Sequence, residues 1–233
     1  MTEVRMRRQT NIVMQYYRQL NRHFGDLHWW PAESPVEVVI GAVLTQNTNW
    51  SNVEKAICNL DARGCLRAEA ILALPKLELE QLIRPSGYFR LKAARLRRVM
   101  EWYSRHEKAS PPPFRQVSDQ TLREELLGIN GVGPETADSI LLYALGRPVF
   151  VVDTYTRRIA QRHKLLNETQ CRDYHELQKY FVERVPPEIA LYNQYHALIV
   201  ATGKHFCGPE PKCAQCPLRR YLPPGMNISL PTL

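Results

Sequence analysis

The segment Glu124–Arg158 reads EELLGINGVGPETADSILLYALGRPVFVVDTYTRR and decides the fold. A helix with apolar periodicity ends at Leu127, and a glycine-rich turn, Gly128–Gly133, follows it. Pro134 then opens a second helix, because the first helical position needs no N–H donor. Glycines allow a positive φ in such a turn and let a phosphate approach the backbone. The segment predicts two helices joined by a tight hairpin, with N–H groups at the start of the second helix available to an anion.

Helical periodicity extends outward from this hairpin over nearly the whole chain. Only Val149–Val152 resembles a strand, and a lone strand has no partner. We therefore predict an all-α fold. Apolar residues recur at steps of three and four in Ile12–Phe24, Val36–Leu44, Trp50–Leu60, Leu77–Ile83, Ala93–Tyr103, Leu122–Leu127, Thr136–Leu145, Tyr155–His163, Tyr174–Val185 and Ile189–Thr202.

Length and charge limit the possible classes of protein. The 233 residues suffice for one large domain or two small ones, and the formal net charge of +8 fits either a slightly cationic surface or a polyanionic partner. The most apolar stretch, Val36–Leu44, is too short to cross a membrane, and Met1–Asn11 has no apolar targeting core. We expect a cytoplasmic, nucleoid-associated protein with no membrane contact. The six cysteines are then free thiols or metal ligands rather than disulfides.

An aspartate in register with the hairpin makes the segment more specific. A glycine-rich turn alone is typical of an ordinary αα-hairpin, but Asp153 lies twenty residues after Gly133 and directly before a helix. This arrangement resembles the helix–hairpin–helix (HhH-GPD) superfamily of DNA glycosylases, and endonuclease III within it, over about residues 10–222. The resemblance implies double-stranded DNA lying between two all-α lobes. One would be a six-helix barrel over residues 30–146, with the hairpin motif at about 119–145, and the other would join residues 1–29 to 147–233.

Asp153 is the expected catalytic residue. An aspartate at a helix start also caps the helix, and here Tyr155 or Thr156 would supply the N–H donor. In the family the matching aspartate is catalytic. Its carboxylate can stabilise the oxocarbenium-like charge that develops on the sugar and orient the attacking water.

Glu135 separates this chain from the glycosylases that also cleave the strand. Endonuclease III carries a lysine two residues after the last hairpin glycine, and its amine forms a Schiff base with the sugar. Glutamate cannot form an imine, so we predict an enzyme that releases the base and leaves an abasic site. We place Glu135 at the base pocket, although it could simply complement the dipole of its helix.

Further residues are expected to contact DNA. Tyr88 matches the loop that wedges into the duplex in endonuclease III, and its alternative is an aromatic packed on the barrel. Gln46 matches the glutamine that the family inserts opposite the lesion, and its alternative is a helix cap. The hairpin residues expected at the DNA are Gly131, Val132, Gly133 and Thr136.

Two tryptophans narrow the choice of base. The stretches around His28–Pro31 and Gly41–Trp50 look like those of the endonuclease-III-like 3-methyladenine glycosylases, in which two aromatics twenty positions apart enclose the flipped base. Trp30 and Trp50 have this separation. A cationic, ring-methylated purine stacks well between indoles, whereas neutral lesions need more hydrogen-bonding groups. The alternative places Trp50 in an apolar helical stripe with Val53 and Ile57.

A cysteine-containing loop over residues 207–222 indicates a metal site with one ligand missing. Cys207, Cys213 and Cys216 have the character of iron–sulfur ligands. Many relatives hold a [4Fe–4S] cluster with four cysteines, but the fourth position here is Leu222. An incomplete cluster, a metal-free loop and zinc all remain open. A structural cluster would hold a basic loop against the phosphates, with Lys212, Arg219 and Arg220.

These features predict a monomeric, monofunctional DNA glycosylase that excises a flipped, alkylated purine base resembling 3-methyladenine. One alternative is an endonuclease III-like enzyme for oxidised pyrimidines or a mismatched base. Another is a non-catalytic helix–hairpin–helix module that only binds DNA. Asp153 and Gln46 together favour an enzyme, because a binding module needs neither.

Overall fold

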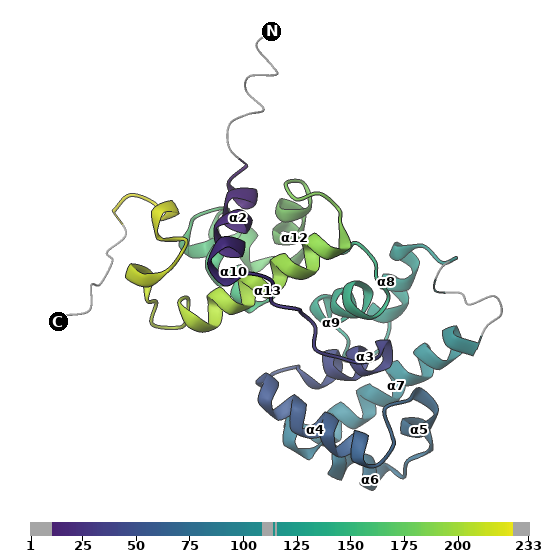
Figure 1. The fold of residues 1–233 in the computed structure, drawn as a ribbon. Coiled ribbons are helices and arrows are strands. Elements are labelled where there is room, and N and C mark those ends of the chain that lie inside the picture. The colour runs from purple at the N-terminus through teal and green to yellow at the C-terminus, as the bar shows by residue number, and fades with distance from the viewer. Residues whose placement is uncertain (1–10, 109–113, 115, 226–233) are drawn as a thin grey trace. The chain divides into compact units, whose positions relative to one another are not determined.

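The computed structural model describes residues 11–108, 114 and 116–225, and the regular secondary structure of these residues is entirely helical (Figure 1). The predicted all-α fold is confirmed. The first ten residues and the last eight, which the sequence analysis included in the second lobe, lie outside the described part of the chain.

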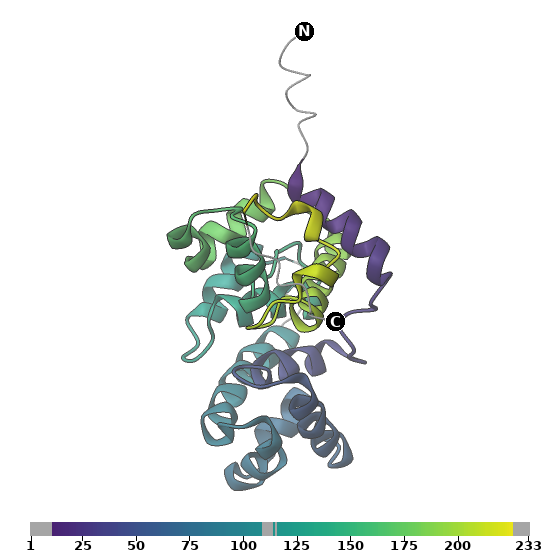
Figure 2. The ribbon, with the colours of Figure 1, turned by 90° about the vertical axis from the view of Figure 1, so that its left-hand side faces the viewer.

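The chain divides into two compact units. The first unit combines Met1–Trp30 with Pro148–Leu233, and the second is the continuous segment Pro31–Arg147. The family resemblance predicts these boundaries at residues 30 and 146. In the first unit the beginning and the end of the chain pack together, since the purple helix α2 (Ile12–Phe24) lies against the green helix α13 (Ile189–His205) (Figures 1 and 2).

The continuous unit is built around α3 (Pro35–Leu44), in which eight of the ten residues are buried. Ser34 caps this helix through its side chain, and Pro35 occupies the first turn. α3 packs against α4, α7, α9 and the π-helical segment that continues α9. The elements of this unit after α3 are α4 (Trp50–Ala62), α5 (Ala68–Ala73), α6 (Lys76–Leu82), η1 (Arg84–Ser86), α7 (Phe89–Lys108), α8 (Asp119–Leu127), α9 (Pro134–Ser139) and the π-helix η3 (Ile140–Ala144).

The discontinuous unit is organised by α13, which packs against both α2 and α10. Close packing near the start of α10 requires Gly203, because a Cβ there would lie 2.1 Å from Cδ1 of Tyr155. Its elements besides α2 and α13 are α10 (Thr154–Arg162), α11 (Glu168–Arg172), α12 (Tyr174–Val182), η4 (Cys213–Gln215) and η5 (Arg219–Tyr221).

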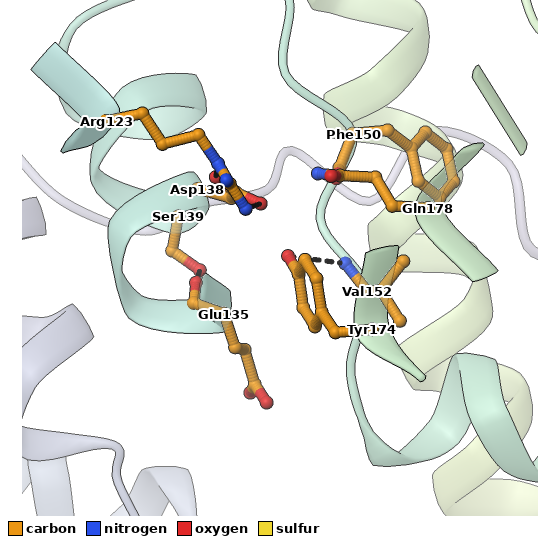
Figure 3. Close-up of polar contacts among 8 residues, drawn as sticks. All are labelled: Arg123, Glu135, Asp138, Ser139, Phe150, Val152, Tyr174 and Gln178. Atoms are coloured by element: carbon orange, nitrogen blue, oxygen red, sulfur yellow. Dashed lines mark hydrogen bonds and ion pairs between the residues drawn. The ribbon is translucent and has the colours of Figure 1, made fainter. Parts of the chain in front are cut away.

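The strand-like segment Val149–Val152 forms irregular chain, in agreement with the expectation that a lone strand would have no partner. Side chains of α12 take the place of a neighbouring strand. Gln178 Nε2 donates to the Phe150 carbonyl at 2.7 Å, and the Val152 N–H lies 3.4 Å from the Tyr174 hydroxyl (Figure 3). Phe150 also stacks on Phe181 at 4.9 Å between ring centroids. α12 therefore fixes the chain that leads to Asp153.

Candidate active site

The hairpin between α8 and α9 depends on a glycine that no other residue could replace without strain. Gly131 has φ +92°, and a Cβ built on it would lie 2.3 Å from Nε of Arg95. Gly133 is exposed and precedes α9 in an extended conformation, so the turn carries no side-chain cap at this helix start. The α9 helix then begins with Pro134, as the sequence predicts.

Gln46 braces this hairpin. Its Nε2 donates to the Gly131 carbonyl at 3.1 Å and to Thr136 Oγ1 at 3.0 Å, and its Oε1 accepts from Arg95 at 2.8 Å. Three of the predicted DNA-contacting residues, Gln46, Gly131 and Thr136, therefore lie together.

Other hairpin residues differ in what they offer to a ligand. The Val132 side chain is 7% exposed, and its N–H donates to the Ile129 carbonyl at 2.9 Å. The Thr136 side chain is equally buried. Gly133 and Glu135 are exposed, so the accessible surface of the turn lies at the start of α9.

An ion pair that the sequence analysis did not identify joins the two hairpin helices. Arg123 of α8 reaches Asp138 of α9 through two contacts, Nε to Oδ1 at 2.6 Å and a terminal nitrogen to Oδ2 at 3.2 Å (Figure 3). Asp138 is fully buried. Because a two-pronged guanidinium–carboxylate contact restricts orientation as well as distance, it fixes the angle between the helices.

Tyr88 projects from a loop in a strained conformation. Gly87 has φ +70° and Tyr88 has φ +44°, and the tyrosine side chain is 67% exposed. A tyrosine in the left-handed region is uncommon, so the surrounding contacts must hold it there. The structure therefore shows an exposed aromatic at the place expected for a wedge, rather than one packed into the core.

A buried lysine holds this loop. Lys92 is 1% exposed, and its Nζ donates to the Ser86 carbonyl at 2.5 Å and to the Leu44 carbonyl at 2.8 Å. These carbonyls lie two residues before Tyr88 and two residues before Gln46. Burial lowers the pKa of Lys92 to about 8, with a smaller contribution from Arg95. One side chain thus ties together two segments that carry predicted DNA contacts.

Asp153 caps α10 and is almost completely buried. Its Oδ1 accepts from the Thr156 N–H and from the Thr156 hydroxyl, both at 2.7 Å. Of the two capping donors expected from the sequence, Thr156 is the one used. The second carboxylate oxygen, Oδ2, lies 3.7 Å from Nε2 of His196. Burial by itself raises the pKa of Asp153. The contacts with His196 and Thr156 lower it by more than this, so the pKa of Asp153 lies below its usual value.

His196 was not identified from the sequence. It is a polar residue in the apolar helix α13, and its side chain is 5% exposed. The Trp29 ring meets the His196 ring edge-on at 6.4 Å, and Nζ of Lys204 lies 6.0 Å from the Trp29 ring centroid. No sequence spacing links residues 29, 153 and 196, so only tertiary packing reveals this cluster.

The two tryptophans predicted to enclose the base belong to different units. Trp30 lies in the discontinuous unit, where it meets Trp29 at 5.9 Å between ring centroids with the rings at 74°. Trp50 is the first residue of α4 in the continuous unit. Each tryptophan is partly exposed, so neither is fully buried in the core of its own unit.

The loop over residues 207–222 offers three cysteines, because Leu222 stands where the resemblance expects the fourth. No group of three or more His, Cys, Asp or Glu side chains is arranged to hold a metal ion within the part of the chain that the structure describes. Arg162 donates to Cys207 Sγ at 3.1 Å and to the Gly208 carbonyl at 2.8 Å. Burial, with Cys207 and Cys213 nearby, raises the pKa of the Cys216 thiol to about 11. Arginine contacts therefore anchor the loop.

Within the described residues, none of the helices combines the length and apolar character needed to cross a membrane.

Comparisons with known proteins point to one family. The family model described as HhH-GPD superfamily base excision DNA repair protein matches residues 40–187. "Putative DNA repair glycosylase MJ1434" of Methanocaldococcus jannaschii is 43% identical over 211 residues, covering 90% of this chain and 95% of that protein. Endonuclease III of Thermotoga maritima is 31% identical over 215 residues, covering 90% and 92%. The crystal structure of the H. pylori 3-methyladenine DNA glycosylase MagIII bound to 1,N6-ethenoadenine has a TM-score of 0.71 and 26% identity, covering 83% and 96%.

Proposed function

Because this chain belongs to the HhH-GPD superfamily of base excision DNA repair proteins and is an endonuclease III-like DNA glycosylase, we propose that it hydrolyses the bond between an alkylated purine and its sugar without cleaving the strand. The observation that carries the proposal is the Asp153 carboxylate, which is buried, ionised and held through one oxygen by Thr156. A tethered carboxylate acts on the sugar with little further loss of conformational freedom.

In the proposed reaction the bond between C1′ and the base nitrogen breaks, and its electron pair leaves with the base. Positive charge develops on the sugar, where the Asp153 carboxylate stabilises it. Water adds to C1′ and gives its proton to the carboxylate, which later returns it to solvent. The products are a free base and an abasic site.

An alkylated purine suits this mechanism because its ring already carries positive charge and leaves readily without a strong acid. Trp30 and Trp50 would enclose the flipped base, since the electron-rich faces of indoles attract cationic rings. MagIII, whose structure is similar to this chain, is named as a 3-methyladenine DNA glycosylase and was solved with a modified adenine bound.

Glu135 supports hydrolysis rather than lyase chemistry. It lies in the first turn of α9, where the resemblance to endonuclease III leads us to expect the lysine, and a carboxylate cannot form a Schiff base with the sugar. The exposed side chain instead lies beside the base in our proposal.

The hairpin and the Tyr88 loop would hold the duplex. Backbone N–H groups at the start of α9 are suited to a phosphate, and an exposed aromatic can fill the space that an extruded nucleotide leaves. We propose that one copy of the chain binds one duplex.

A lesion panel tests the proposal. Duplexes with 7-methylguanine, 1,N6-ethenoadenine, thymine glycol or a G·T mismatch are incubated with protein, and abasic sites are scored by hot alkali. We expect release of the alkylated purines, loss of at least about 1000-fold in rate for Asp153→Asn, and no covalent DNA complex after borohydride reduction. Preferential release of thymine glycol would favour the oxidised-pyrimidine alternative, and release by Asp153→Asn at the wild-type rate would overturn the role of Asp153.

If no duplex loses its base, the DNA-binding module becomes the better description. A covalent complex after borohydride reduction would contradict monofunctional chemistry. Glu135→Lys is the matched positive control for trapping, because it restores an amine at the family position.

A further inference from the structure

The two oxygens of the Asp153 carboxylate have different surroundings. Oδ1 is occupied by two hydrogen bonds from Thr156, both within one helical turn. Oδ2 is the oxygen that the cap leaves for chemistry, because both capping donors go to Oδ1. The local motif therefore engages only one of the two carboxylate oxygens.

A second element supplies the missing restraint. His196 of α13 places Nε2 3.7 Å from Oδ2, which is longer than a direct hydrogen bond but within range of electrostatic attraction. At this distance the imidazole favours the position in which Oδ2 faces it.

The packing of α13 against α10 sets this distance. Gly203 lies seven residues after His196 and therefore on the same helix face. The Tyr155 ring occupies the space that a side chain at Gly203 would need. Because Tyr155 follows Asp153 by two residues, this contact brings the start of α10 close to the helix that carries His196.

The other side of His196 is covered as well. Trp29 meets the imidazole edge-on, and the Lys204 ammonium lies 6.0 Å from the Trp29 ring centroid. Charged groups near this cluster are therefore Asp153 of α10 and Lys204 of α13. A buried imidazole between an indole and a carboxylate has little freedom to turn elsewhere.

We propose that His196 is a positioning residue for the glycosylase reaction: it holds Oδ2 of Asp153 in its reactive orientation and stabilises the carboxylate as an anion. The inference rests on the proposed catalytic role of Asp153. The proposed stabilisation of the anion agrees with the lowered pKa of Asp153. Burial raises this pKa, and the contact with His196 is the largest of the contributions that lower it.

The experiment compares His196→Ala and His196→Gln with the wild type on the 1,N6-ethenoadenine and thymine glycol duplexes. Under single-turnover conditions, we expect His196→Ala to release the base about 10- to 100-fold more slowly. His196→Gln, which keeps an N–H donor, should recover part of the rate. Affinity for an undamaged duplex should stay unchanged, because the buried imidazole is not a DNA contact. The acidic limb of the rate profile should move to higher pH, since the carboxylate is easier to protonate without its partner.

His163→Gln is the matched control, because it removes another buried histidine of the same unit that does not contact Asp153. It should lower stability without moving the pH profile. Carbon-detected NMR of labelled aspartate measures the carboxyl pKa of Asp153 without any substrate, and Asp153→Asn assigns the signal. If His196→Ala does not fold, the same measurement is made on His196→Gln. A carboxyl pKa and rate profile that match the wild type in the His196 variants would overturn the inference. Full activity of Asp153→Asn would overturn the proposed function instead.

Discussion

His163 is a buried histidine whose charge state links stability to pH. Its Nδ1 lies 2.8 Å from the Tyr16 hydroxyl and 3.4 Å from the Tyr221 carbonyl. Burial lowers its pKa to about 4, although the Tyr221 contact opposes this. As pH falls below about 6.5, His163 takes up a proton in the unfolded chain, whereas in the folded chain it does so only near pH 4. Stability is therefore lost between these two values.

We expect the wild type to lose about 2 kcal/mol more than His163→Gln between pH 7 and pH 5. Urea denaturation of both proteins at each pH measures this difference. His163→Gln should be the less stable protein at pH 7, because the glutamine packs less well beside Tyr16. A stability difference that stays constant over this range would show that His163 takes up its proton at the same pH in the folded and unfolded chains, and would contradict this prediction.

Single residues show where prediction from sequence ends. The capping role of Asp153 followed from its place before a helix, and Thr156 proved to be one of the two expected donors. Lys92 and His196 gave no such signal, because a buried polar residue in the middle of a helix acquires its partners only when other elements pack against it. Both partners of Lys92 are backbone carbonyls, which leave no trace in the side-chain pattern.

At the scale of elements, Lys92 joins the end of α3 to the loop before α7. Lys92→Met would leave the Leu44 and Ser86 carbonyls without this donor, and unpaired buried carbonyls are costly. We expect faster amide hydrogen exchange at residues 45–48 and 86–88 and a several-fold weaker affinity for duplex DNA. Lys55→Met, at an exposed lysine of α4, removes the same charge and should change neither. Equal exchange in the two variants would contradict this role for Lys92.

Elements were predictable in proportion to their length and periodicity. α2 and α3 each carry a clear apolar pattern and lie within about one residue of the expected positions. α5 and α11 are too short, at six and five residues, to show a helical repeat. Residues Thr136–Leu145 were expected as an ordinary helix, but the chain widens into a π-helix from Ile140 to Ala144. The π-helical segment packs against α3. We found no local sequence feature that predicts the change from α-helix to π-helix.

For the whole molecule, the net charge of +8 and the family together predict binding that weakens as salt increases. Charge alone did not distinguish a DNA-binding protein from a mildly cationic one, and the hairpin with Asp153 made that distinction. The loop after α13 concentrates exposed cations at Lys212, Arg219 and Arg220. Arg162 and Arg158 anchor this loop through contacts with Cys207 and Gly208. These contacts help to hold its basic surface in place.

The salt dependence of binding tests whether this loop contacts phosphates. Each phosphate contact adds about 0.9 to the slope of log K against log salt, so replacing the three loop cations with glutamine should lower the slope by about 2 to 3. Binding is measured with the Asp153→Asn background, in which DNA stays intact. The charge-matched control replaces Lys55, Arg63 and Lys76 with glutamine. Arg63 and Lys76 already pair with Glu78 and Glu80, so we expect little change in slope. Equal slopes for the two triple variants would mean that the phosphates meet other cations of the chain.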